Sequence, residues 1–362
     1  MRGVVVVNAL LTLGILVALG YRRLAAKSPP PPLFHLLNCI YGLLRPDWHT
    51  GWPTPAPRLA AQMRYPSTDP PPNTANLHGE IEVLTDGTEA THWYAAAAGV
   101  TWHFVTAGNP DHETVLMLHG LPESWWAFHH QISELSKDRY VVALDCKGYG
   151  QSDKRLDLDY RAATMAAETA ALLDELGVDR FHIVAHDRGA VIADHMTSVP
   201  ALKGRILRYV RMQQSFNEPH GKPRPPHALF ATKLGEANFK SRGIIHIIYE
   251  KVMAAGLTPS TLKRLDYEFK FKGVAEAVRR YFQVNNFDIE HRDRHESLFA
   301  HMTMPVLILQ GRWDPGQHPE EYARSSEFAA DLRVEFVEAN HFTHIENPVA
   351  CNRAIRRFLG SV

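Results

Sequence analysis

A carboxylate flanked by small residues lies near the middle of the chain, in Ala185-His186-Asp187-Arg188-Gly189. The segment follows a short apolar run and precedes a helical one, so we expect Asp187 on a tight strand-to-helix turn that pushes its side chain outward. A carboxylate is ionised at neutral pH and can attack a saturated carbon without help from a base. The resulting ester would then need a base that activates water.

Two later segments could supply that base. Gln310-Gly311-Arg312-Trp313-Asp314 follows one expected strand, and Ala339-Asn340-His341-Phe342 follows the last one. Asp314 would orient the imidazole of His341 and stabilise its protonated form. The order nucleophile, acid, histidine along the chain is typical of one class of hydrolytic triad.

A turn that could stabilise an oxyanion is His119-Gly120-Leu121-Pro122, directly after an expected strand. The backbone N–H groups of Leu121 and Arg188 would face the carbonyl of the nucleophile when its ester is attacked. Trp125, a little further on, could line the substrate pocket or fill the core. The Gly-rich turn Asp145 to Ser152 is interpreted as structural.

From about Thr91, short apolar β-branched runs alternate with longer helical segments. Expected strands are 101–106, 114–118, 140–145, 181–185, 205–212, 306–309 and 333–337, and expected helices are 124–136, 160–176, 189–198 and 349–359. This alternation predicts an α/β fold with a mainly parallel sheet and helices on both faces.

The alternation stops between residues 217 and 300, where helical stretches and a Pro-rich basic loop occur without strands. We interpret these residues as a helical lid inserted between two strands, because ligands of such sheets bind at the carboxyl ends of the strands. The predicted core then has two parts, residues 86–216 and 301–362.

The N-terminal part differs in character. Val4 to Gly20 is apolar except for Asn8 and Thr12, and basic residues follow it. Residues 1–27 are therefore expected to be a transmembrane anchor or a cleaved signal, with the anchor favoured and the catalytic part in the cytoplasm. Residues 28–85 read as a Pro-rich linker with a possible interfacial helix.

The overall composition excludes several classes of function. The chain has 362 residues, 45% of them hydrophobic, and 39 basic residues balance 39 acidic ones. This balance argues against a nucleic-acid partner. The spacing of His and Cys residues matches no common metal motif, so neither a metal nor another cofactor is expected, and three cysteines do not form a disulfide framework.

Residues 91 to about 360 resemble the epoxide hydrolase and dehalogenase branch of the α/β-hydrolase family, in which the nucleophile is Asp. The segment from His119 to Trp126 is similar to the HGxPE-S-W motif of epoxide hydrolases, and His186 to Gly189 is similar to their HDxG elbow. The resemblance implies an alkyl-enzyme ester on the aspartate. It also implies one or two lid tyrosines that bind the epoxide oxygen; Tyr281 fits the second, and Tyr249 is a guess for the first.

Two departures leave alternatives open. Arg188 stands where epoxide hydrolases usually have Trp, and it resembles the elbow arginine with which fluoroacetate dehalogenases bind a carboxylate. Their second arginine is Val191 here, and the Asn typical of haloalkane dehalogenases is Leu121. The leading hypothesis is hydrolysis of a small lipophilic epoxide to a diol; a carbon-halogen hydrolase and a non-catalytic binding homologue are the alternatives.

Overall fold

The structure is a computed structural model that describes residues 77–213, 230–240, 248–249, 257–285, 302–314, 329 and 331–360. The predicted anchor, residues 1–27, and most of the predicted linker lie outside these residues. In the part of the chain that is described, no helix combines the length and the apolar character needed to cross a bilayer.

The described core is built around one nine-stranded sheet in the order β1-β2-β3-β5-β4-β6-β7-β8-β9. Its strands are β1 (Ile81–Val83), β2 (Glu89–Ala97), β3 (Val100–Ala107), β4 (Thr114–Leu118), β5 (Tyr140–Leu144), β6 (Phe181–His186), β7 (Ile206–Met212), β8 (Val306–Gly311) and β9 (Leu332–Val337). Strands β5, β4, β6, β7, β8 and β9 run parallel, and β1, β2 and β3 add an antiparallel extension beside β5. The predicted mainly parallel α/β architecture is confirmed.

The central strands form because their sequences are apolar along their whole length. Every residue of β4 and β6 is buried, as expected for parallel strands covered on both faces. The strand predicted over 101–106 is β3, but the other two strands of the extension were not anticipated, and β1 lies inside residues 28–85, where a linker was predicted. It has three residues, of which Ile81 and Val83 are exposed, so its sequence carries no strand pattern and its structure depends on pairing with β2.

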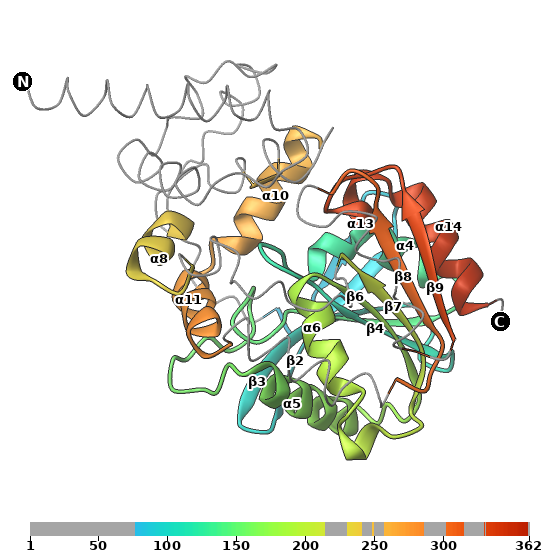
Figure 1. Ribbon diagram of the computed structural model, residues 1–362, viewed down its shortest axis with the longest axis horizontal. Helices are drawn as coiled ribbons and strands as arrows, with labels where there is room; N and C mark the ends of the chain where they lie inside the picture. The colour runs from blue at the N-terminus through green and yellow to red at the C-terminus, as the bar shows by residue number, and fades with distance from the viewer. Residues whose placement is uncertain are drawn as a thin grey trace, which may run out of the picture.

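Helices cover both faces of the sheet (Figure 1). On one face α5 (Ala162–Glu175) packs against α6 (Arg188–Met196); on the other, α4 (His129–Leu135) packs against α14 (Pro348–Leu359). The helix predicted over 124–136 is divided into a 3-10 helix, Trp125–Phe128, followed by α4. The Ser124 hydroxyl accepts the N–H of Trp126 and so caps the start of the 3-10 helix.

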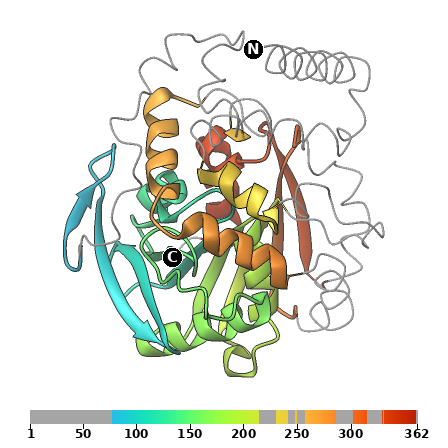
Figure 2. The same cartoon turned by 90° about the vertical axis from the view of Figure 1, so that its left-hand side faces the viewer.

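Three described helices follow β7 and precede β8: α8 (Lys233–Lys240), α10 (Pro259–Phe269) and α11 (Val274–Val284). Figures 1 and 2 agree that they lie together beyond one end of the sheet. Asn285 fastens the end of α11 to the core, because its Oδ1 accepts the N–H of Ala162 at 2.9 Å. Arg264 of α10 forms a bidentate pair with Glu82 of β1.

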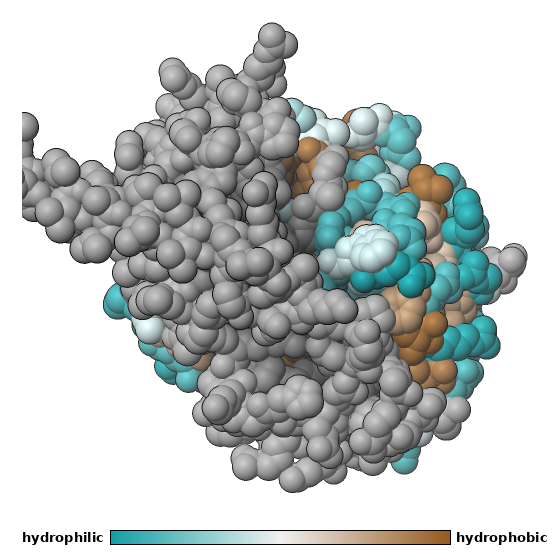
Figure 3. Space-filling view, turned by 45° about the horizontal axis from the view of Figure 1, so that its top comes forward, coloured by the Kyte–Doolittle hydropathy of each residue, from teal (hydrophilic) through white to brown (hydrophobic). Residues whose placement is uncertain are grey.

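The visible surface of the described residues is mixed in character (Figure 3). Hydrophobic residues form small groups that hydrophilic residues separate. Large apolar side chains with high exposure are Ile81 and Val83, which share β1, and Leu156, Tyr267, Trp313 and Val349, which come from different parts of the fold.

A buried ion pair joins helix α6 to strand β7. The Arg211 guanidinium donates to both carboxylate oxygens of Asp194, at 2.9 and 2.8 Å, and the Tyr209 hydroxyl donates to Asp194 at 3.0 Å. Arg211 and Asp194 have no exposed surface. Because α6 begins directly after Asp187, this pair fixes the helix that supports the candidate nucleophile.

We predict that Arg211→Met lowers the free energy of unfolding by about 3–5 kcal/mol, since it leaves the Asp194 carboxylate buried and uncompensated. Chemical denaturation measures the loss. The matched control is Arg357→Met, which removes an arginine from the exposed pair with Glu335 and should change the same quantity by no more than about 1 kcal/mol. Equal losses in the two variants would contradict the assignment.

Candidate active site

Asp187 occupies the turn between β6 and α6 with φ 47° and ψ −114°. A positive φ is unfavourable for a non-glycine residue, so the surrounding packing must impose it. The neighbours leave no spare room: a Cβ built on Gly189 would lie 2.1 Å from the Leu118 carbonyl oxygen, and one on Gly120 would lie 2.5 Å from the Asp187 Cβ. The predicted tight strand-to-helix turn with small flanking residues is confirmed.

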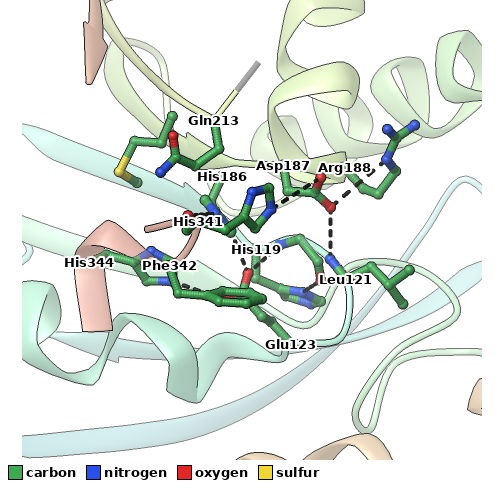
Figure 4. A network of polar contacts seen from close by, with 12 residues as sticks. His119, Leu121, Glu123, His186, Asp187, Arg188, Gln213, His341, Phe342 and His344 are labelled. Carbon is green, nitrogen blue, oxygen red and sulfur yellow. Dashed lines mark hydrogen bonds and ion pairs between the residues drawn. The ribbon is translucent and has the colours of Figure 1, made fainter. Parts of the chain in front are cut away.

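The three residues of the predicted triad lie together, and Figure 4 shows His341 beside Asp187. His341 Nδ1 is 2.9 Å from Asp314 Oδ2, and His341 Nε2 is 3.7 Å from Asp187 Oδ2. Asp314 also accepts a hydrogen bond from the Gln310 side chain at 3.2 Å. The imidazole therefore lies between two carboxylates that come from the ends of β6 and β8.

The charges in this group perturb one another strongly. Burial alone would raise the pKa of Asp187, but the nearby imidazole of His341 and the positive charge of Arg188 hold this pKa well below its ordinary value. Burial alone would lower the pKa of His341, but the charge of Asp314, the hydrogen bond to Asp314 and the nearby carboxylate of Asp187 raise it to about 10. At neutral pH the resting site therefore holds an ionised Asp187 beside an imidazolium.

Donors face the carboxylate of Asp187 from two directions. The Leu121 N–H donates to Oδ1 at 3.1 Å, and the Arg188 Nε lies 3.8 Å from the same oxygen. The Arg188 guanidinium also lies over the ring of Phe282, 5.7 Å from its centroid. The Leu121 N–H therefore points at the group that the predicted oxyanion donor should face. The predicted oxyanion role of Arg188 concerned its backbone N–H, and the structure also places its positively charged side chain near Asp187.

Two tyrosines from the region between β7 and β8 are buried near the site. Tyr281 is 2% exposed and Tyr249 is 0% exposed. The Tyr249 hydroxyl lies 3.4 Å from the Pro122 carbonyl oxygen, and its ring packs on Phe342. Burial, together with the charges of Glu123 and Asp187, raises the pKa of Tyr249 well above its ordinary value, so Asp187 lies within electrostatic range of this phenol.

Trp125 has different neighbours. Its ring packs edge-on against His92 and lies under Arg264, and its backbone N–H donates to Asp145. Its indole N–H is buried without an acceptor among the described residues. These contacts associate Trp125 with the junction of β2 and α10; its predicted contact with substrate stays a prediction.

A buried hydrogen-bonded cluster supports the turns of the site, and it was not predicted from the sequence. Glu123 Oε2 accepts the Gly120 N–H at 2.8 Å and lies 2.7 Å from His186 Nδ1, while its Oε1 lies 2.8 Å from His344 Nε2. His186 Nε2 lies 3.0 Å from the His341 carbonyl oxygen. One carboxylate thus connects the oxyanion turn, the nucleophile turn and the loop of the base (Figure 4). The only sequence signal for it was the position of Glu123 inside the segment that resembles HGxPE.

Glu123, His186 and His344 are also close enough to one another to be considered as metal ligands. Their geometry favours hydrogen bonding instead. The two ring nitrogens lie at hydrogen-bonding distance from the carboxylate oxygens, and a backbone N–H occupies one of these oxygens as well. A metal ion could bind only if the protons between the ring nitrogens and the carboxylate oxygens were first removed.

A protein-family model described as alpha/beta hydrolase fold matches residues 113–348. The chain belongs to this family. Its relatives include proteins named epoxide hydrolase, in agreement with the predicted resemblance. Epoxide hydrolase 4 of Mus musculus is 36% identical over 113 residues, which are 30% of this chain and 32% of that protein. Epoxide hydrolase B of Mycobacterium tuberculosis is 39% identical over 99 residues, 26% of this chain and 28% of that protein. The chain therefore spans about a third of the length of these curated relatives.

Solved structures agree with this fold. Cfl2 from Burkholderia cenocepacia superposes with a TM-score of 0.66 at 24% identity, covering 75% of this chain and 96% of that one. Epoxide hydrolase VrEH1 from Vigna radiata has a TM-score of 0.61 at 22% identity, covering 75% and 98%. Identities this low establish a common fold and no more.

We predict that Glu123→Gln lowers the free energy of unfolding by about 1–3 kcal/mol, because an amide group must then face a buried donor. Chemical denaturation measures this loss. The matched control, Glu335→Gln, changes a partly exposed carboxylate and should leave the unfolding midpoint unchanged. A fully stable Glu123→Gln protein would show that the cluster does not depend on the carboxylate.

Proposed function

We propose that this protein is a hydrolase that opens an epoxide to a diol through an ester on Asp187. The observation that carries the proposal is the ionised Asp187 on its strained turn, with the Leu121 N–H at 3.1 Å and His341 at 3.7 Å. A serine would need His341 to remove its proton before attack, whereas a carboxylate is ready to attack carbon. The similarity to proteins named epoxide hydrolase supports the same reaction.

In the first half of the proposed reaction, an oxygen of Asp187 attacks an epoxide carbon and the ring C–O bond breaks. The electron pair stays on the ring oxygen, which needs a hydrogen-bond donor as its charge grows. Tyr281 is our candidate because it is buried on α11, and its neighbour Phe282 contacts Arg188 of the nucleophile turn.

In the second half, water attacks the ester and His341 accepts a proton from that water. In the resting site, the negative charge of Asp187 helps to raise the pKa of His341 to about 10. Ester formation removes this charge, so the pKa of His341 falls just when a base is needed. Asp314 remains to orient the ring, and the Leu121 N–H can bind the oxyanion of the attacked ester.

A carbon-halogen hydrolase is the second candidate, and Arg188 is the observation that favours it. Its guanidinium lies beside the nucleophile and over an aromatic ring, where it could bind a substrate carboxylate. A non-catalytic binding homologue is a weaker alternative, because such a protein has no need for a nucleophile, a base and an acid at these distances.

The remaining features of the proposal rest on the sequence alone. They are the membrane anchor in residues 1–27 with a cytoplasmic catalytic part, the lipophilic nature of the substrate, and the function of residues 217–300 as a lid. The division into a linker, a two-part core and this lid likewise stays a prediction.

We predict that His341→Gln accumulates a covalent adduct when it is incubated with an excess of styrene oxide. The carboxylate can still attack, but no base activates water to hydrolyse the ester. Asp314→Asn should accumulate less adduct, since His341 is present but poorly oriented. Intact-protein mass spectrometry should detect the mass of one substrate on His341→Gln.

Asp187→Ala is the matched control and should carry no adduct under the same conditions. Parallel incubations with a haloacetate and a haloalkane separate the candidates, because the reactive class of substrate identifies the leaving group. Absence of any adduct on His341→Gln with all three classes would refute the ester mechanism and leave the binding homologue.

We also predict that the two half-reactions depend differently on pH. Ester formation should change little between about pH 5 and about pH 9, because the pKa of Asp187 lies far below this range. Ester hydrolysis should be slow at low pH and accelerate as His341 loses its proton. The midpoint of this acceleration should lie below the resting pKa of about 10. Rapid-quench single-turnover measurements follow both steps; a common pH profile would contradict the charge switch.

A further inference from the structure

The Gly-rich turn Asp145–Ser152, between β5 and α5, holds Tyr149 in a fixed backbone position. Gly148 and Gly150 on either side of it have φ +95° and +45°. A Cβ on Gly150 would lie 2.0 Å from Asp145 Oδ2, so the turn closes tightly around that carboxylate. The Tyr149 N–H donates to the Cys146 carbonyl at 2.9 Å, and its own carbonyl accepts the Ser152 N–H at 3.1 Å.

The side chain of Tyr149 lies beneath the oxyanion turn and is 4% exposed. Its ring packs edge-on against His119, with 5.1 Å between the ring centroids. His119 is fixed in turn, since its Nδ1 donates to the Gly120 carbonyl at 2.8 Å and its Nε2 accepts the Cys146 N–H at 3.0 Å. The ring of Tyr149 therefore packs against a histidine that two hydrogen bonds hold in place, and this packing helps to fix its own position.

The hydroxyl of Tyr149 is buried, yet it has no hydrogen-bond partner among the residues that the structure describes. An unpaired buried hydroxyl destabilises a fold, and a phenylalanine would occupy the same space without that cost. Packing alone therefore does not explain why this residue is a tyrosine.

The groups around this hydroxyl belong to the proposed reaction. Burial raises the pKa of Tyr149 well above its ordinary value, and the nearby Tyr281 and Asp187 raise it further, while Arg188 acts in the opposite direction. The phenol therefore keeps its proton and remains a donor. Helix α11, which carries Tyr281, lies directly over the turn, because a Cβ on Gly148 would be 3.1 Å from the Ala277 Cβ.

We propose that Tyr149 is a hydroxyl donor to the epoxide oxygen, contributed by the α/β core rather than by the inserted helices. This inference rests on the proposed function. Asp187 would form the new C–O bond to the substrate, and the ring oxygen would leave with the electron pair of the broken bond. A phenol proton, from Tyr149 or Tyr281, would then pass to that oxygen.

The proton balance closes in the second half-reaction. Water adds to the ester and the alcohol leaves, which returns Asp187 to its carboxylate form and releases one proton. His341 accepts that proton and so becomes an imidazolium again, while the proton that His341 gave up before it acted as a base restores the phenol. The sum is addition of one water molecule to the epoxide, without any other reactant.

The test uses His341→Gln, in which ester formation can be timed because the ester persists. With styrene oxide, adding Tyr149→Phe should slow the appearance of the adduct by about tenfold to thousandfold, the usual contribution of a general acid. The unfolding midpoint should stay the same or rise, because an unpaired hydroxyl has been removed. If Tyr149 were purely structural, Tyr149→Phe would leave the rate of adduct appearance unchanged and would lower the unfolding midpoint.

Tyr160→Phe in the same background is the matched control. Tyr160 is equally buried, but its hydroxyl already donates to the Arg155 carbonyl at 3.1 Å, so adduct formation should keep its rate. An unchanged rate with Tyr149→Phe overturns the role of Tyr149 and leaves the proposed function intact. Absence of adduct on His341→Gln itself, with every epoxide tried, overturns both.

Discussion

The site depends first on one strained residue. Asp187 has a positive φ, and the residues around it are selected by that conformation: Gly189 is small because the Leu118 carbonyl is so near, and Gly120 is small because the Asp187 side chain projects over it. The sheet makes this arrangement rigid, since β4 and β6 are paired neighbours that end at the same edge. The two buried strands and helix α6 thus hold Asp187 in a strained conformation that the turn alone could not maintain.

The charges around His341 determine the different roles of the two carboxylates. Two carboxylates face one imidazole at 2.9 and 3.7 Å, and in the proposed reaction only Asp187 attacks the substrate. Asp314 is 2% exposed and hydrogen-bonded to Gln310, so it holds a negative charge in a fixed position beside the imidazole. In the proposed reaction, Asp187 loses its charge when the ester forms. The same histidine can therefore be a cation before the first step and a base after it, without any movement of the chain.

Much of the fold and the triad could be predicted from the sequence because the signals are local. The continuous apolar runs of β4, β5 and β6 predict buried parallel strands, and Asp187 directly follows β6, while Asp314 and His341 follow β8 and β9 within a few residues. The extension β1-β2 could not be predicted, since β1 is three residues long and gains its structure from pairing. The Glu123 cluster was equally hidden: its hydrogen bonds join positions 63 and 221 residues apart, and no short motif records them.

In the proposed reaction, the hydrogen-bond donors of the site come from two parts of the chain. Leu121 and Tyr149 belong to turns of the core, and their backbones are fixed by glycine conformations, by His119 and by the buried Glu123. Tyr281 belongs to an inserted helix that the core holds through Asn285. A core donor is in position whenever the fold is intact, whereas a donor on an insertion also depends on how that insertion is docked. A site with donors of both kinds could stabilise the leaving oxygen from the rigid side, while the inserted helices adapt to the shape of the substrate.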